Sequence, residues 1–249
     1  MELNSIELAL KEIYDGWQLG NEKENNGYSA MFRMGFPDEY IDSDRPLLMY
    51  VGQEDLNGDE YKTQEWVRKY QTVQLTENNA MLPREKIRYS PFWEFCRKLD
   101  DMGYNCLWNN LDKFLKADHK EHIAKEEAFG FNAPYGEERL SVLQREINLL
   151  KPKVVVFAIG PREKYRKSLA SAFSIDASLL YAHRPTRQNC VHDISAALGL
   201  KDTIVLWTYH PNYLSRGKLK DEAIVKIETA LNIHGNTTGR NELCKKNWI

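Results

Sequence analysis

The amino-acid sequence predicts an α/β fold in which a central sheet of four parallel strands lies between layers of helices. Four short, nearly continuous apolar runs indicate strands buried on both faces, at residues 46–52, 104–108, 153–159 and 203–209. Segments with helical periodicity separate these runs. Apolar strands that alternate with helices are typical of a parallel, doubly wound sheet, so we expect an α/β/α sandwich.

Three segments predict the helices of this sandwich. Asn4 and Glu7 have the spacing of a capping box at the start of a helix. The apolar residues that follow recur at helical spacing: Ile6, Leu10, Ile13 and Trp17. Further helices are expected at 91–101 and 137–150, and Pro152 stops the second of these just before its strand.

Length and charge limit the organisation and the partners. The chain has 249 residues, which suits one α/β domain over 1–249, with a core at about 46–231. The segment 235–249 is rich in Asn, Thr, Gly and Lys, and we expect a partly flexible tail there. The formal net charge is −2, so composition does not indicate nucleic-acid binding, and a DNA partner would need a local basic patch.

The sequence carries no signal for a metal cluster, a membrane span or a secretory leader. Its four cysteines lack CxxC pairing and metal-ligand spacing: Cys96, Cys106, Cys190 and Cys244. No apolar run approaches the roughly 20 residues that a membrane-spanning helix needs. Residues 1–4 do not begin a signal peptide, which would have a basic region followed by an apolar one. We therefore expect a cytoplasmic monomer that needs no cofactor, metal or membrane.

Polar groups follow the ends of the expected strands. In an open parallel sheet, ligands bind beyond the carboxyl ends of the strands. The segments at these positions are 52–58, 109–113, 160–162 and 210–216. Because they bring carboxylate, amide and imidazole groups to one edge of the sheet, they predict a site there.

The same segments resemble motifs of the uracil-DNA glycosylase superfamily, in the superfamily's order. Residues 51–54 (VGQE) resemble the GQD-type motif after the first strand, and 210–212 (HPN) resemble the HPS or HPN motif after the last. Residues 108–113 (WNNLDK) are similar to the segment that supplies a base-reading asparagine, and 146–157 to the superfamily's helix and third strand. The resemblance covers about 46–216.

The resemblance implies a monofunctional DNA glycosylase. Such an enzyme flips a nucleotide out of DNA, hydrolyses the N-glycosidic bond of uracil or a modified pyrimidine, and leaves an abasic site. No cofactor is implied, because the iron–sulfur branch needs four spaced cysteines that this sequence lacks.

Two carboxylates and one imidazole are the expected catalytic groups. Glu54 occupies the position of the superfamily's catalytic aspartate, and Asp55 takes that role if the register shifts by one residue. A carboxylate there stabilises an oxocarbenium-like sugar and orients or activates water. His210 is expected to donate to the departing base, which leaves with negative charge. Gly52 and Gln53 are expected to line the base-binding pocket.

The base itself is expected to meet an amide and an aromatic ring. Asn110 carries a donor and an acceptor on one planar amide, which can pair with a pyrimidine edge, and Asn109 is the alternative in the next register. Phe92 or Trp93 is expected to stack on the flipped base, although aromatic side chains in such a helix more often belong to the core.

The segment after His210 is the expected DNA-binding element. Asn212 and Ser215 are expected to hold a phosphate or the loop, and Tyr213 and Arg216 belong to a wedge that fills the duplex. Together with Arg216, other cationic side chains are candidates for phosphate contacts: Arg184, Arg187, Lys218 and Lys220.

One departure from the resemblance concerns substrate size. Classical uracil-DNA glycosylases carry a tyrosine two positions after the catalytic carboxylate, and its ring excludes 5-substituted pyrimidines. The matching residue here is Leu56, or Asn57 if Asp55 is catalytic, followed by Gly58. We therefore expect tolerance of a substituent at C5, unless the 59–88 loop closes the gap.

Three other functions stay open at this stage. One is a defence glycosylase that excises hypermodified cytosine, for example glucosylated hydroxymethylcytosine, from phage DNA. Another is a non-catalytic DNA- or partner-binding descendant of the fold, which the Glu-Asp sequence at 54–55 favours in place of the familiar Asp-Pro. The third, a hydrolase of free nucleosides, would have no use for a wedge at 213–216.

Overall fold

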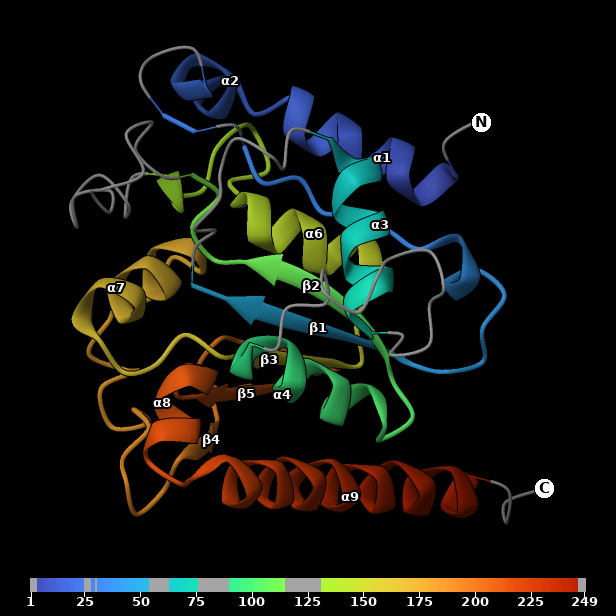
Figure 1. Ribbon diagram of the computed structural model, residues 1–249, viewed down its shortest axis with the longest axis vertical. Helices are drawn as coiled ribbons and strands as arrows, with labels where there is room; N and C mark the ends of the chain where they lie inside the picture. Colours follow the sequence, from blue (N-terminus) through green and yellow to red (C-terminus); the bar gives the residue numbers. More distant parts are fainter. Residues whose placement is uncertain are drawn as a thin grey trace.

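Five strands form one mixed sheet in the order β2-β1-β3-β5-β4. The computed structural model describes the residue ranges 4–24, 28–29, 31–53, 63–75, 90–114 and 131–245, with backbone alone at 23–24 and 233–245. Helices flank the sheet, so the predicted α/β class is confirmed (Figure 1).

Four strands run parallel, and they are the four that the apolar runs predict. Their bounds are Leu47–Gly52 for β1, Asn105–Asn110 for β2, Val154–Phe157 for β3 and Ile204–Thr208 for β5. The prediction of a four-stranded, fully parallel sheet is wrong by one strand. β4 (Val191–Asp193) pairs antiparallel with β5 at the edge of the sheet. It has only three residues, and two of them are polar, so it leaves no apolar run in the sequence.

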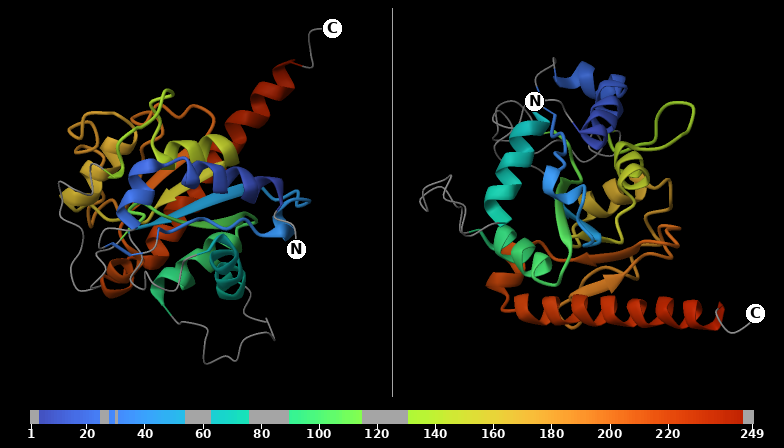
Figure 2. Two further views of the ribbon diagram at one scale, coloured as in Figure 1. Left: turned by 90° about the horizontal axis from the view of Figure 1, so that it is seen from above. Right: turned by 90° about the vertical axis from the view of Figure 1, so that its right-hand side faces the viewer.

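The helices lie in two layers. Figure 2 shows α1 and α6 over one face of the sheet and α3 and α4 over the other, with α9 near β4 and β5. The bounds of the helical elements are α1 Ser5–Asp15, α2 Gln18–Glu24, η1 Asp38–Tyr40, α3 Gln64–Leu75, α4 Pro91–Asp100, α6 Val142–Leu150, α7 Glu163–Ala172, α8 Pro211–Arg216 and α9 Lys220–Lys245. α9 continues past residue 235, where the sequence predicts a partly flexible tail.

Side-chain caps fix where two of these helices begin. The side chain of Asn4 accepts a hydrogen bond from the backbone N–H of Glu7 at 2.8 Å, as its spacing predicts. α6 begins later than the periodicity indicates, because Ser141 and Gln144 form a reciprocal capping box. Residues 137–139 form a turn instead, and Leu140 pairs with Tyr135 in an isolated antiparallel bridge.

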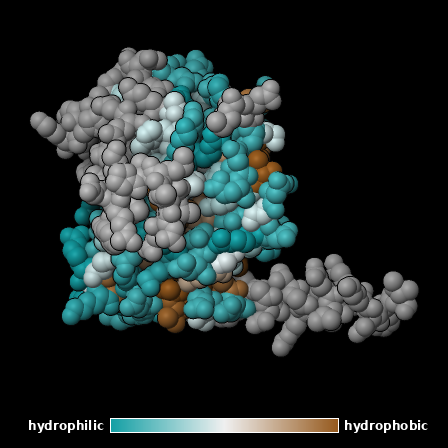
Figure 3. Space-filling view, turned by 45° about the vertical axis from the view of Figure 1, so that its right-hand side comes forward, coloured by the Kyte–Doolittle hydropathy of each residue, from teal (hydrophilic) through white to brown (hydrophobic). Residues whose placement is uncertain are grey.

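On the face drawn in Figure 3, the described residues are mainly hydrophilic, with small, separate hydrophobic areas. None of the helices in the described part of the chain combines the length and the apolar character that crossing a membrane requires.

A close backbone approach sets the position of α3. Gly35 lies so near this helix that an added Cβ would stand 2.4 Å from the carbonyl oxygen of Gln64 and 2.5 Å from the backbone nitrogen of Arg68. Both of these are backbone atoms, which cannot turn aside as the end of a side chain can. The helix therefore packs at this distance only against glycine.

We expect Gly35→Ala to destabilise the protein by about 1–3 kcal/mol or more, because the new methyl group must push α3 away from its neighbours. Urea unfolding followed by circular dichroism measures the loss. Ala at the exposed Lys201 serves as the control and should change the free energy of unfolding by less than about 0.5 kcal/mol. Equal stability of the Gly35 variant and the wild type would contradict this packing.

Candidate active site

The parallel strands end at one edge of the sheet, where the arrowheads of β1 and β2 point in Figure 1. The last residues of β1 and β2, Gly52 and Asn110, are register partners. β5 ends at Thr208, two residues before His210, which caps α8. Three of the segments that the sequence singles out therefore meet at this edge.

The two adjacent asparagines of β2 have different surroundings. Asn109 is fully buried, and its Nδ2 donates to Glu146 Oε2 of α6 at 2.8 Å. Asn110 lies beside Gly52 and Phe92. Since successive side chains of a strand point to opposite faces, only one of them can stand at the site. The structure places Asn110 there, and Asn109 belongs to the layer beneath α6.

The absence of a side chain at Gly52 lets two groups come close to the end of β1. A Cβ at this position would stand 2.8 Å from Asn110 Oδ1 and 3.0 Å from Cε2 of Phe92. Even the smallest side chain would thus collide with the amide and crowd the ring. The absence of a side chain at Gly52 brings an amide and a flat aromatic ring against the end of β1.

The amide of Asn110 has one hydrogen-bonded group and one group that lacks a partner among the described residues. Its Oδ1 accepts a hydrogen bond from Trp108 Nε1 at 3.2 Å. Its Nδ2 is buried and has no hydrogen-bond partner within the described part of the chain. A buried donor that is left unpaired costs about 1–3 kcal/mol, so Nδ2 is suited to a ligand that brings an acceptor.

The structure separates the two aromatic candidates of α4. Phe92 is partly buried, and its ring lies 6.3 Å from that of His210 at an angle of 27°. It also packs on the ring of Tyr50 at 4.6 Å. Trp93 is only 4% exposed and packs on Trp108 at 5.1 Å, so it belongs to the core. Phe92 is the aromatic side chain at the site.

His210 is oriented by the helix that it caps. Its Nδ1 accepts a hydrogen bond from the backbone N–H of Asn212 at 3.2 Å. A neutral imidazole has one donor and one acceptor nitrogen, so this bond places the proton on Nε2. The ring therefore has a defined donor atom, as stabilisation of a departing anion requires.

Gln53 ties the strand ends to one another. Its side-chain Nε2 donates to the backbone carbonyl oxygen of Ile159 at 2.6 Å. Its backbone carbonyl oxygen accepts from the backbone N–H of Asp112 at 2.9 Å. The segment after β1 is thereby fixed to the segments after β3 and β2. In the structure Gln53 has a positioning role at the predicted base pocket.

The predicted catalytic carboxylates Glu54 and Asp55 lie outside the described residues. The same holds for Leu56, Asn57 and Gly58, on which the expected tolerance for large bases depends. These assignments stay predictions.

A buried polar network supports the end of β2, where Asn110 lies. Lys113 and Glu146 form an ion pair of 2.6 Å, with side chains that are 3% and 0% exposed. Tyr14 donates its hydroxyl to Glu146 Oε1 at 2.6 Å. Asn109 completes the network, since its Oδ1 accepts from both Lys113 Nζ and the backbone N–H of Asn110. Sequence reasoning missed this network, although Glu146 lies next to Ile147 on the apolar stripe of its helix.

Burial shifts the pKa of two groups in this network. Removal from water lowers the pKa of the Lys113 ammonium, and the neighbouring Glu146 carboxylate opposes that effect. Burial, with a smaller contribution from the same carboxylate, raises the pKa of Tyr14 well above its ordinary value. Tyr14 therefore stays a hydrogen-bond donor at neutral pH.

A second buried cluster joins the end of β2 to α7. Asp112 Oδ2 lies 3.2 Å from Lys164 Nζ, and Asp112 Oδ1 accepts from Asn132 Nδ2 at 2.9 Å. All three residues are buried. Asp112 is a second buried carboxylate at this edge, and only its place after a strand marks it in the sequence.

The helix after His210 presents an exposed face. Tyr213 is 39% exposed and stacks on Tyr209 at 4.3 Å. Arg216 is exposed, and its Nε donates to the carbonyl oxygen of Asn212. The hydroxyl of Ser215 is buried, with no hydrogen-bond partner in the part of the chain that the structure describes.

The other predicted basic residues have different surroundings. The guanidinium of Arg184 lies 4.2 Å from the ring centroid of Tyr181. Arg187 and Lys218 are exposed. Lys220 instead forms an ion pair with Glu94 at 2.5 Å, which joins α9 to α4. Its charge is therefore engaged within the protein.

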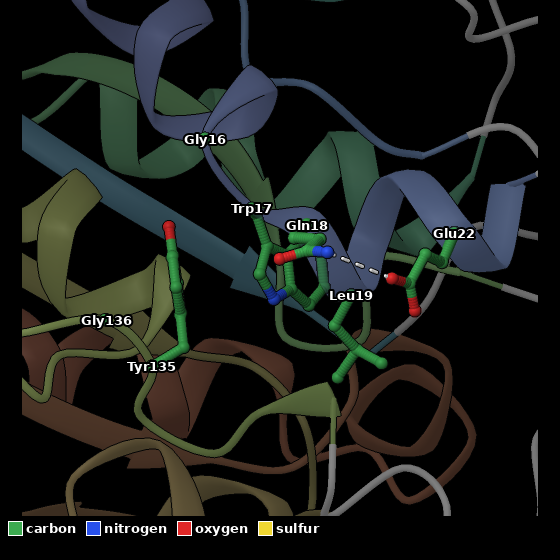
Figure 4. A pocket seen from close by; sticks show the side chains of 7 residues that line it. All are labelled: Gly16, Trp17, Gln18, Leu19, Glu22, Tyr135 and Gly136. Carbon is green, nitrogen blue, oxygen red and sulfur yellow. Dashed lines mark hydrogen bonds between the residues drawn. The ribbon is translucent and has the colours of Figure 1, made fainter.

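A separate depression of about 460 Å³ lies between α1, α2 and the turn at residue 135 (Figure 4). Its lining residues are Gly16, Trp17, Gln18, Leu19, Glu22, Tyr135 and Gly136. The one carboxylate among them, Glu22, accepts a hydrogen bond from Gln18 at 3.3 Å. Because this depression brings together no pair of acid and base groups, the edge of the sheet is the stronger candidate.

Within the described residues, no group of three or more His, Cys, Asp or Glu side chains is arranged to hold a metal ion. No protein-family model and no curated protein matches this chain. The interpretation of the site therefore depends on its geometry and on the resemblance of its motifs.

We expect Glu146→Gln to lower the free energy of unfolding by about 3–5 kcal/mol at neutral pH, because it leaves the Lys113 ammonium buried without its counter-ion. Urea unfolding measures the loss. Glu138, whose partner Arg145 lies nearer the surface, provides the control, and Glu138→Gln should cost less than about 1 kcal/mol. Similar small losses in both variants would show that the buried pair does not stabilise the fold.

Proposed function

We propose that this protein is a DNA glycosylase that hydrolyses the N-glycosidic bond of a flipped uracil or modified pyrimidine and leaves an abasic site. The observation that carries the proposal is the arrangement of three groups at the end of β1. The amide of Asn110, whose nitrogen has no hydrogen-bond partner among the described residues, and the ring of Phe92 both lie against Gly52, and the imidazole of His210 lies beside Phe92. In this proposal the sheet and its helices form a fold of the uracil-DNA glycosylase type.

The three groups suit a flat heterocycle with polar edges. A pyrimidine that stacks on Phe92 can present the polar groups on the edge of its ring to the amide of Asn110. The buried Nδ2 of Asn110 then gains an acceptor on the base. A base held in a duplex cannot reach these groups, so the nucleotide must leave the stack.

The chemistry follows from the charges that develop as the bond breaks. The N1–C1′ bond breaks with its electron pair on the base, and C1′ becomes oxocarbenium-like. His210 donates a hydrogen bond from Nε2 to O2 of the departing base. This hydrogen bond stabilises the negative charge that develops on the base. Glu54 or Asp55 is the carboxylate that stabilises the sugar cation and takes a proton from the water that attacks C1′.

The surface beside His210 supports DNA as the substrate over a free nucleoside. Tyr213 and Arg216 are exposed on the helix that His210 caps, at the positions predicted for a wedge and a phosphate contact. A free nucleoside would be bound within the pocket and would not need contacts with Tyr213 and Arg216, which lie outside it. With a net charge of −2, binding to DNA must depend on such local contacts.

Two further functions remain alternatives. A glycosylase that removes hypermodified cytosine from phage DNA would use the same groups, and Leu56 or Asn57 in place of a tyrosine favours it. A non-catalytic DNA- or partner-binding protein would keep the fold without the reaction. Base release distinguishes the first from the second.

The decisive experiment is base release from a panel of matched oligonucleotides that carry uracil, 5-substituted uracil or 5-substituted cytosine. Alkali converts each abasic site into a strand break that a gel resolves. We expect release, with at least one 5-substituted base cleaved as well as or better than plain uracil. Strong activity on uracil and none on any 5-substituted base would contradict the expected pocket size. No release from any oligonucleotide would reject a glycosylase for these bases.

We expect Glu54→Gln and His210→Ala each to reduce base release by about a hundredfold or more, since both remove preorganised charge stabilisation. The two variants should keep the wild-type circular dichroism spectrum. Asp55→Asn, measured beside them, decides which carboxylate is catalytic. Near-normal release by both Glu54→Gln and His210→Ala would refute this site.

We expect Arg216→Glu to weaken DNA binding and to reduce the slope of log affinity against log salt by about one, because one phosphate contact is lost. Fluorescence anisotropy at several salt concentrations measures both quantities. Lys153 is exposed at the amino end of β3, at the opposite edge of the sheet, so Lys153→Glu is the matched control. Equal effects of the two substitutions would place the DNA surface elsewhere.

A further inference from the structure

Trp108 is held in one orientation by surrounding aromatic rings. Its side chain is 5% exposed. The rings that pack around it are Phe32 at 4.8 Å, Trp93 at 5.1 Å, Tyr70 at 5.8 Å and Phe92 at 6.4 Å. Its backbone N–H donates to Gln71 Oε1 at 3.0 Å, which fixes this stretch of β2 to α3. The indole therefore has little freedom to turn.

The fixed indole decides which way the neighbouring amide faces. Trp108 and Asn110 lie two residues apart on β2, and so on the same face of the sheet. The indole N–H is a donor only, and an amide has one acceptor end and one donor end. The 3.2 Å bond therefore requires the oxygen of Asn110 to face Trp108. The amide nitrogen must point the other way, where it is buried without a protein partner in the described part of the chain.

We propose that Trp108 is a specificity-determining positioning residue, which locks the Asn110 amide so that the ligand meets its N–H group. This inference depends on the proposed function, and it adds the chemistry by which the site selects a base. A ligand is accepted if it places an acceptor, such as a carbonyl oxygen or an unprotonated ring nitrogen, against Nδ2. A ligand that places an amino group there meets a second donor and is rejected.

This selection depends on the fixed orientation of the Asn110 amide. A freely turning amide could present oxygen or nitrogen and would suit either pattern on the edge of a pyrimidine. Uracil has an acceptor at C4 and a donor at N3, and cytosine has the reverse. If both bases are held in the same orientation, the fixed Nδ2 meets an acceptor on one of them and a donor on the other, so the two bases differ in how well they pair with Asn110.

The first test measures the hydrogen bond between Trp108 and Asn110 in the free protein, and it does not depend on enzymatic activity. In ¹⁵N-labelled protein, the indole signal of Trp108 is identified by its loss in Trp108→Phe. Asn110→Leu removes the acceptor, and we expect the Trp108 indole proton to move to higher field and to exchange faster with solvent. Asn110→Asp keeps an oxygen for the indole and should retain the hydrogen-bonded position. An unchanged signal in Asn110→Leu would overturn the proposal.

A second test measures selectivity. The base that wild type releases best is compared with its counterpart in which the C4 carbonyl and amino groups are exchanged, with the same substituent at C5. We expect Trp108→Phe to narrow the ratio of the two kcat/KM values by about fivefold or more, which is the effect of losing one neutral hydrogen bond.

Trp93→Phe is the matched control. It removes the same volume from the same aromatic cluster, and its indole makes no hydrogen bond to Asn110 in the described residues. Trp93→Phe should change the kcat/KM values for the two bases by the same factor, so that their ratio stays the same. An unchanged ratio in Trp108→Phe, or equal narrowing in both variants, would overturn the proposal. If wild type releases no base while the indole signal responds as expected, the glycosylase assignment fails and the oriented amide stands.

Discussion

Lys113 and Glu146 form an ion pair inside the protein, and the geometry of the candidate site depends on it. Neither side chain reaches solvent to any extent, so each charge needs the other to offset its loss of hydration. Tyr14 and Asn109 satisfy further hydrogen bonds of the pair. The pair therefore joins three elements, α1, α6 and the end of β2.

The network reaches the site through the backbone. Asn109 uses its oxygen to hold the N–H of Asn110, and the alternation of side chains along β2 then turns Asn110 to the other face of the sheet. On that face Trp108 fixes the amide, and Gly52 gives it room beside Phe92. A charged cluster on one face thus helps to determine where Asn110, the proposed ligand-binding group, stands on the other face.

Much of this architecture is predictable from the sequence, and the exceptions have physical reasons. The four parallel strands are buried on both faces, so each leaves an apolar run. β4 pairs on one side only and exposes Asp193, so it leaves no such run. α6 was expected to begin at residue 137, because its periodicity was clearer than the capping box that sets its start at Val142.

The candidate site is likewise predictable from the sequence only in part. The order of the motifs points to Asn110 and His210. The choices between Asn110 and Asn109, and between Phe92 and Trp93, depend on which face of the strand or helix turns toward the site. Packing decides this orientation, and a single sequence does not reveal it. Glu146 was missed for a related reason, since an acidic residue in an amphipathic helix ordinarily faces water, and only its partners explain its burial.

A crystal structure with bound DNA would show whether the edge of the sheet receives a flipped base. The oligonucleotide would carry a 2′-fluorinated pyrimidine nucleotide, whose glycosidic bond resists cleavage. We expect this nucleotide to be flipped out, with its base against the ring of Phe92, an acceptor atom within hydrogen-bond distance of Asn110 Nδ2, and O2 facing His210 Nε2. A base that stays stacked in the duplex, or a nucleotide bound away from the carboxyl edge of the sheet, would contradict this expectation.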